Sequence, residues 1–209
     1  MKKALLYIAY TIAYGFWWVM SLLPLWVLYR LSDLLYYVIT YVVRYRHDVI
    51  WNNLSTSFPE KSEAELREIE HQFYHWFCDY LVETVKLMSI SKRQLMQRMT
   101  FTGMEQIHEI LSEGQSIGVY LGHLGNWEWI TSLPYWTSNG LCCQLYHPLE
   151  NEYFDRLFKY VRELHGALCI PMQESLRKII TLSREGKPLI VGFFPFISLL
   201  RSLYRWSFQ

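Results

Sequence analysis

A histidine and a glutamate stand close together in a segment rich in glycine and tryptophan. His123 and Glu128 belong to the run Gly122-His123-Leu124-Gly125-Asn126-Trp127-Glu128-Trp129. On one regular helix their side chains would point about 140° apart, so they can face each other only if His123 lies in a turn and Glu128 on the helix that follows. A carboxylate that accepts a hydrogen bond from one imidazole nitrogen leaves the other nitrogen as a base. Such a pair can deprotonate a hydroxyl group that attacks a thioester. The spacing alone favours a histidine satisfied in a core, and it is the flanking glycines and tryptophans and the preceding strand that favour the catalytic interpretation.

The elements around this segment predict an α/β fold with a mostly parallel sheet flanked by helices. Residues 117–121, 141–146, 167–170 and 189–194 have the pattern of strands, and residues 152–164 and 173–184 that of helices. Strands that alternate with helices are typical of a layered α/β fold. Because active sites in such sheets form at the carboxyl ends of strands, the position of His123 just after the first strand favours a catalytic role.

The segment before the sheet is predicted to be helical and to follow a linker. Ser62 and Ser91 each precede a glutamate or glutamine by three residues, which is the pattern of a capping box that begins a helix. Residues 45–60 are rich in asparagine, serine and threonine, and we predict that they form a linker.

The composition directs attention to the N-terminus. The chain is 52% hydrophobic and 19% charged with a formal net charge of +1, which excludes a disordered chain and a nucleic-acid reader that depends on bulk positive charge. No charged residue and no histidine occurs from Ala4 to Tyr29. As a helix this run would be about 39 Å long, more than the roughly 30 Å of a bilayer core. We predict a membrane anchor at residues 1–45 and a second domain at residues 46–209, with a buried core helix as the alternative for the apolar run.

Three other patterns bear on function. The four cysteines contain no C-x-x-C pair, which favours a reduced domain that faces the cytoplasm. His71, His75 and Asp79 share a helical face, but the polar side of an amphipathic helix explains them more simply than a metal site. The run Gly114-Gln115-Ser116-Ile117-Gly118 fits G-x-S-x-G, but its serine precedes the strand, which is the wrong order for a nucleophile elbow.

Basic residues lie on the polar side of the predicted helix at 152–164. Arg156, Lys159 and Arg162 are cations of the kind that a phosphorylated sugar lipid or a phosphopantetheine group needs. An ordinary solvated face with an Asp155–Lys159 pair remains the alternative. We place Asn126, Arg156, Lys159 and Arg162 among the candidate substrate-binding residues.

The segment Gly122–Glu128 also resembles the H-x4-(D/E) block of glycerolipid and lipid A acyltransferases. More narrowly, it is similar to the bacterial lipid A biosynthesis lauroyl/myristoyl acyltransferase family. Matching context lies at residues 46–50, 53–55, 57–60, 77–80, 83–87 and 146–151, and the resemblance extends to about Gly192.

The resemblance implies a glycerolipid-acyltransferase-like enzyme of the bacterial inner membrane whose catalytic domain faces the cytoplasm. It implies transfer of an acyl chain from acyl carrier protein onto a lipid A precursor, with His123 as general base and Glu128 as its charge-relay partner. No metal or diffusible cofactor is implied. Another lipid or aminolipid as acceptor, and an inactive membrane fragment, are the alternatives.

The sequence departs from the family pattern after the last predicted strand. Family members continue into a segment that contains an aspartate, whereas residues 199–209 here contain no acidic residue. We therefore expect a truncated or frame-shifted product that is incomplete at the C-terminus and lacks the later wall of the site.

Overall fold

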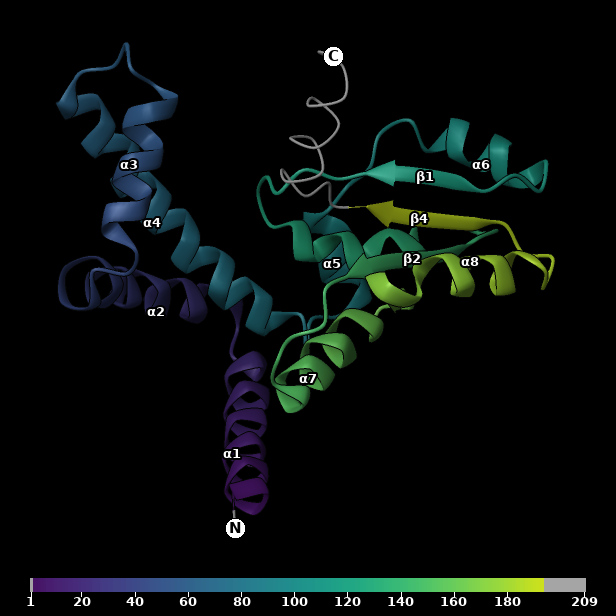
Figure 1. The fold of residues 1–209 in the computed structure, drawn as a ribbon, viewed down its shortest axis with the longest axis horizontal. Coiled ribbons are helices and arrows are strands. Elements are labelled where there is room, and N and C mark those ends of the chain that lie inside the picture. Colours follow the sequence, from purple (N-terminus) through teal and green to yellow (C-terminus); the bar gives the residue numbers. More distant parts are fainter. Residues whose placement is uncertain (1, 194–209) are drawn as a thin grey trace, which may run out of the picture. The chain divides into compact units, whose positions relative to one another are not determined.

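The computed structural model describes residues 2–193, with side chains from Leu6 onward, as two compact units (Figure 1). One unit comprises the residues up to Gly15 together with those from Ile90 on, and the other is Phe16–Ser89. Helix α1 (Lys2–Leu22) belongs partly to each. The end of the strand predicted at 189–194 and the acid-free segment at 199–209 lie outside the described residues.

The first unit is built on a four-stranded parallel sheet. Its strands are β1 (Ile117–Tyr120), β2 (Leu141–Tyr146), β3 (Leu168–Pro171) and β4 (Leu189–Phe193). Their order across the sheet is β1-β4-β2-β3, and every neighbouring pair is parallel. Ile190 of β4 is in register with both Ile117 and Cys142. The carboxyl ends of the strands therefore meet at one edge, and the prediction of an α/β fold with a parallel sheet is confirmed.

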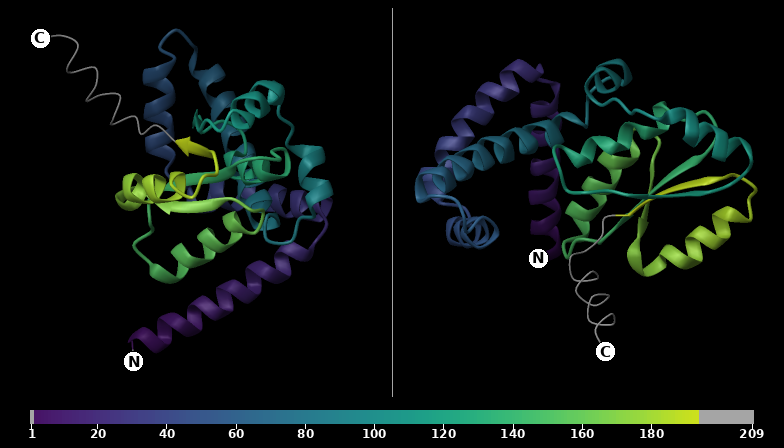
Figure 2. Two further views of the ribbon diagram at one scale, coloured as in Figure 1. Left: turned by 90° about the vertical axis from the view of Figure 1, so that its right-hand side faces the viewer. Right: turned by 90° about the horizontal axis from the view of Figure 1, so that it is seen from above.

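Helices cover both faces of this sheet because consecutive strand residues point to opposite sides. One face packs against α6 (Met104–Ser112) and the 3₁₀ helix η2 (Trp127–Tyr135) through a buried cluster of Met104, Leu111, Leu133, Cys142 and Ile190. The other face packs against α8 (Ser175–Ser183) through Cys143, Leu145, Ile170, Leu182, Leu189 and Val191. Figure 2 shows α8 on the opposite side of the sheet from α6.

The remaining elements of the first unit surround this core. They are α5 (Lys92–Arg98), α7 (Glu152–Glu163) and the short 3₁₀ helix η3 (Met172–Glu174). The predicted capping box at Ser91 is confirmed, since its hydroxyl accepts a hydrogen bond from the backbone N–H of Gln94. Tyr7 and Tyr10 at the start of α1 pack against the ring of Tyr153 on α7.

The second unit is helical. Besides the end of α1 it contains α2 (Leu25–Tyr37), the π-helix η1 (Val38–Val43), α3 (His47–Ser57) and α4 (Glu63–Lys86). Leu25 and Leu28 of α2 are buried against Val82 of α4. Polar contacts join the same two helices: Ser32 Oγ donates to Asp79, and Tyr29 donates to Glu83, each at 2.7 Å. The capping box predicted at Ser62 is present at the start of α4.

Helix α3 corrects the prediction of a linker at residues 45–60. Its polar side chains bond back to its own backbone, because the hydroxyl groups of Ser55 and Thr56 donate to the carbonyl oxygen of Asn52 at 3.2 and 2.7 Å. Such i−3 and i−4 bonds allow serine and threonine to remain inside a helix. A composition typical of loops therefore forms a helix here.

A buried lysine lies where α1 ends. Lys86 Nζ donates to the carbonyl oxygens of Ser21 at 2.7 Å and Leu23 at 2.9 Å. These carbonyl groups lie at the C-terminal end of α1, where carbonyl oxygens have no N–H partner further along the helix. Burial lowers the pKa of the Lys86 ammonium group from its usual 10.5.

The structure does not support the predicted membrane-spanning helix. Within the described residues, no helix combines the length and the apolar character that a membrane crossing requires. The uncharged run is divided, since α1 ends at Leu22 and α2 begins at Leu25. In addition, α1 carries the polar ring groups of five aromatic residues, which lower its mean hydropathy: Tyr7, Tyr10, Tyr14, Trp17 and Trp18.

Candidate functional site

The loop after β1 carries the predicted base to the carboxyl edge of the sheet. Strand pairing continues just past β1, where the N–H of Leu121 donates to the carbonyl oxygen of Phe193 at 2.8 Å. The chain then turns at Gly125, whose φ of +59° lies in the left-handed region that favours glycine. The backbone N–H of Trp127 donates to the carbonyl oxygen of Gly125 at 3.2 Å, which leads directly into η2. The predicted turn is therefore present.

His123 is exposed in this loop, where a substrate can reach it. Its imidazole packs edge-on against the indole of Trp127, with the ring centroids 5.0 Å apart. The alternative of a histidine that is buried in the core with its hydrogen bonds made does not apply, because His123 is a surface residue beside an aromatic ring. Asn126 lies at the N-terminal cap of η2 and is half-buried.

Glu128 is buried in the first turn of η2, with only 5% of its surface exposed. Its carboxylate accepts two hydrogen bonds from the guanidinium group of Arg162: Nε donates to Oε2 at 2.7 Å and Nη2 to Oε1 at 2.5 Å. His123 lies in a turn and Glu128 lies on the helix that follows, which is the arrangement that a His–Glu dyad with this spacing requires. The direct contact between these two side chains stays a prediction.

Helix α7 carries Arg162 and is fixed beside the end of β2. The side chain of Asn151 caps its first turn by accepting hydrogen bonds from the N–H groups of Tyr153 and Phe154. Asp155 accepts a hydrogen bond from the N–H of Leu149 at 2.8 Å and one from the hydroxyl of Tyr146 at 3.3 Å. Burial, together with this carboxylate, raises the pKa of Tyr146 to about 12. These contacts anchor the N-terminal half of α7 at the same edge as the His123 loop.

The three predicted phosphate-binding cations make different contacts. Arg156 is exposed and pairs with Glu152, and Lys159 pairs with Glu163, each at 3.9 Å along the surface of α7. Arg162 instead pairs with Glu128 on η2. Arg162 therefore differs from Arg156 and Lys159, because its partner is a buried carboxylate on another element.

The cysteines do not supply a nucleophile for this site. All four are buried free thiols. Cys169 on β3 lies within electrostatic range of Arg162 and Glu128, but burial raises its pKa to about 12, so the thiolate is disfavoured. Among the described residues, no group of three or more histidine, cysteine or carboxylate side chains is arranged to hold a metal ion.

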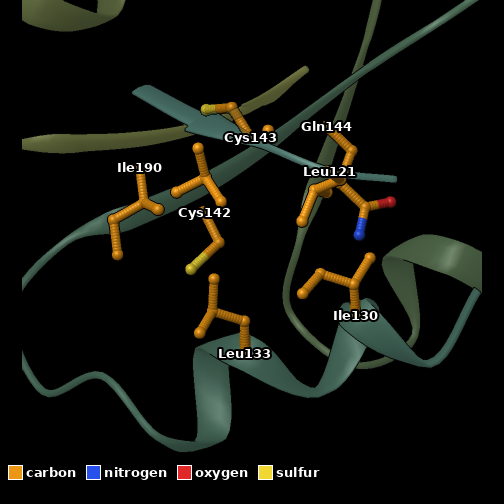
Figure 3. Close-up of a pocket in the computed structure, with 9 residues that line it drawn as sticks. Leu121, Ile130, Leu133, Cys142, Cys143, Gln144 and Ile190 are labelled. Atoms are coloured by element: carbon orange, nitrogen blue, oxygen red, sulfur yellow. The ribbon is translucent and has the colours of Figure 1, made fainter. Parts of the chain in front are cut away.

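A small apolar cavity lies behind the loop, between η2 and the sheet (Figure 3). Leu133 of η2 lies opposite Cys142, and Ile130 of η2 lies opposite Leu121 and Gln144. Its volume is about 20 Å³, which is close to the space of one water molecule. A fatty acyl chain does not fit into a space of this size.

Sequence reasoning missed the pair of Glu128 and Arg162. It assigned Arg162 to a phosphate group because the residue lies among other cations on a helix. The two partners are 34 positions apart, so no local spacing marks their contact. Only the fold of α7 over η2 brings them together.

Comparison with known proteins identifies the family of the chain. The model of the family described as bacterial lipid A biosynthesis acyltransferase matches residues 1–196. A search of curated proteins finds no match. The matched range includes β1, the His123 loop, η2 and α7, and hence each residue of the candidate site. The chain belongs to the bacterial lipid A biosynthesis acyltransferase family, and it is an acyltransferase.

Proposed function

We propose that this acyltransferase moves a fatty acyl chain from acyl carrier protein to a hydroxyl group of a lipid A precursor, with His123 as general base and Glu128 as its partner. The observation that carries the proposal is the position of His123, which is exposed in the loop after the carboxyl end of β1, five positions before the buried Glu128 at the start of η2. The family match supports the reaction class.

The chemical step follows from these two side chains. The neutral imidazole of His123 takes the proton of the acceptor hydroxyl while the hydroxyl oxygen forms a bond to the carbonyl carbon of the thioester. The tetrahedral intermediate then breaks its carbon–sulfur bond, and the imidazolium returns the proton to the departing thiolate. The products are an ester and the free thiol of the carrier. The carboxylate of Glu128 orients the imidazole and stabilises its charged form.

The substrates of this reaction carry phosphate groups, and the surroundings of the loop include cations for them. Arg156 and Lys159 lie on the outer surface of α7, where their ion pairs with Glu152 and Glu163 are long, at 3.9 Å. The Arg156 pair is exposed and the Lys159 pair is partly exposed, and long ion pairs of this kind contribute little to stability, so an incoming phosphate can replace the carboxylates at small cost. We assign these two residues, together with Asn126 at the start of η2, to substrate binding.

The acceptor is a lipid, and we propose that the enzyme works at the cytoplasmic face of the bacterial inner membrane. Apolar side chains of α1 support this location. Ile8, Ile12, Phe16 and Val19 repeat at helical spacing and each exposes more than half of its surface. An exposed apolar stripe on a helix is suited to the boundary between lipid headgroups and acyl chains.

The proposal is tested by a transfer assay with acyl carrier protein that bears a labelled acyl chain and a lipid A precursor. Replacement of His123 by alanine is expected to lower kcat by about 10²- to 10⁴-fold, the usual contribution of a general base. His108→Ala is a matched control, because this histidine of α6 is also exposed and its Nε2 lies 2.9 Å from the backbone oxygen of Trp136, outside the His123 loop. A His123→Ala protein with the wild-type kcat, or a wild-type protein that transfers no acyl chain to the precursor, would contradict the proposal.

A further inference from the structure

The contact between Arg162 and Glu128 differs in kind from the other ion pairs of α7. The guanidinium group presents two parallel N–H donors to the two carboxylate oxygens, at 2.7 and 2.5 Å. The side chain of Glu128 is 6% exposed and that of Arg162 is 23% exposed. Paired donors of this geometry fix both the distance and the plane of a carboxylate, which a single lysine contact does not.

The pair joins two elements that are themselves held in place. Glu128 follows the turn at Gly125 and lies in a helix whose Leu133 is part of the core. Arg162 lies beside Val161, which is buried, in the last turn of α7. The next residue, Glu163, accepts a hydrogen bond from the backbone N–H of Cys169 on β3 at 3.0 Å. Arg162 therefore reaches Glu128 from a part of the fold with little freedom to move.

Removal of the guanidinium group would leave the Glu128 carboxylate buried without its cation. An unpaired buried charge is unfavourable, so the side chain would turn toward water. This change would disturb the side chain that the proposed function pairs with His123. The position of the Glu128 carboxylate thus depends on Arg162.

We propose that Arg162 is a positioning residue of the acyl transfer reaction, which holds the carboxylate of Glu128 in its orientation toward the His123 loop. This inference rests on the proposed function, because it gives Arg162 its effect through the partner of the general base. It differs from a phosphate contact, in which Arg162 would act on the substrate directly.

The two roles predict different kinetics for Arg162→Met. A positioning residue affects mainly the chemical step, so kcat is expected to fall by about 10- to 100-fold while KM changes little, as is typical when a supporting partner of a catalytic group is lost. Arg162→Lys retains the charge but loses the two parallel donors, and it is expected to recover only part of the lost kcat. Arg177→Met on α8 is the matched control, because this exposed arginine lies on the opposite side of the sheet.

A double-mutant cycle makes the test independent of any general loss of structure. If Arg162 acts through Glu128, Arg162→Met added to Glu128→Gln will lower kcat little further, since the group it positions is already neutral. Losses in kcat that multiply in the double variant, or a raised KM with an unchanged kcat, would overturn the inference. Circular dichroism and thermal denaturation of each variant show whether it is folded at the assay temperature, and Arg162→Lys provides the comparison if Arg162→Met is not.

The outcome for His123 separates this inference from the proposed function. An active His123→Ala protein contradicts the proposed mechanism whatever Arg162 does. An inactive His123→Ala protein combined with a pure KM effect at Arg162 leaves the proposed function in place and overturns the positioning role.

Discussion

Two buried hydroxyl groups in η2 lead to a prediction at the scale of single residues. Thr131 and Ser132 are 0% exposed, and neither hydroxyl has a hydrogen-bond partner among residues 2–193. A buried polar group without a partner costs about 1–3 kcal/mol. Thr131→Val replaces the hydroxyl by a methyl group of similar shape, and we expect it to raise the free energy of unfolding by about 1 kcal/mol in urea denaturation.

Thr84→Val is the matched control for this prediction. Thr84 is also buried, but its hydroxyl donates to the carbonyl oxygen of Tyr80 at 2.8 Å, so the substitution loses a bond that is made. We expect Thr84→Val to be less stable than the wild type. If Thr131→Val is destabilised as much as Thr84→Val, the prediction that the unpaired hydroxyl of Thr131 destabilises the folded protein is wrong.

The sequence alone predicted the turn that carries His123 and the helix that carries Glu128, but not the residues that surround them. His123 and Glu128 are close in the chain. The glycines near the histidine indicate a turn, so that the two residues do not lie on one continuous helix. The same reasoning placed Arg162 with Arg156 and Lys159, because all three lie within one helix. Which side of α7 faces η2 depends on packing between distant elements, and the sequence pattern does not contain that information.

At the scale of elements, the junction between α1 and α2 predicts a dependence of stability on pH. Because burial lowers the pKa of Lys86 in the folded protein, the unfolded chain still holds a proton there when the folded chain has released it. In the interval between that lowered value and 10.5, the free energy of unfolding should therefore rise with pH. Lys86→Met removes the titrating group and should lack this rise.

The measurement is urea denaturation of both proteins at a series of alkaline pH values. Groups that titrate in both proteins cancel when the free energy of unfolding of Lys86→Met is subtracted from that of the wild type. We expect this difference in free energy of unfolding to increase as the pH approaches 10.5. A difference that is constant across the series would mean that Lys86 keeps its ordinary affinity for a proton.

Prediction of the elements succeeded where a repeating pattern or a cap defines them. The four strands of the sheet and the capping boxes at Ser62 and Ser91 follow from short-range patterns, and the structure confirms them. Helix α3 was mistaken for a linker, because its asparagine, serine and threonine residues are typical of loops until their side chains bond within a helix. Its formation could not be deduced from composition.

At the scale of the whole molecule, the apolar stripe of α1 predicts binding to a lipid surface. Ile8 and Ile12 are 55% and 67% exposed on one face of the helix. Replacing both by asparagine should lower the fraction of protein that sediments with vesicles of phosphatidylethanolamine and phosphatidylglycerol, since binding depends on buried apolar area. Ile180→Asn removes an exposed isoleucine from α8 and is the control. Equal sedimentation of all three proteins would mean that the stripe does not contact lipid.

The order of strands in the sheet has a consequence for how this protein is made. β4 is synthesised after the other three strands, yet it lies between β1 and β2 and supplies the register partner of both. At about 5–20 residues per second, Ile190 leaves the ribosome roughly 4 to 15 seconds after its partner Ile117. Throughout this interval β1 is an open strand edge in the nascent chain, and open edges are prone to pair with other chains. Production of this enzyme should therefore depend on translation speed and on chaperones that shield the unfinished sheet.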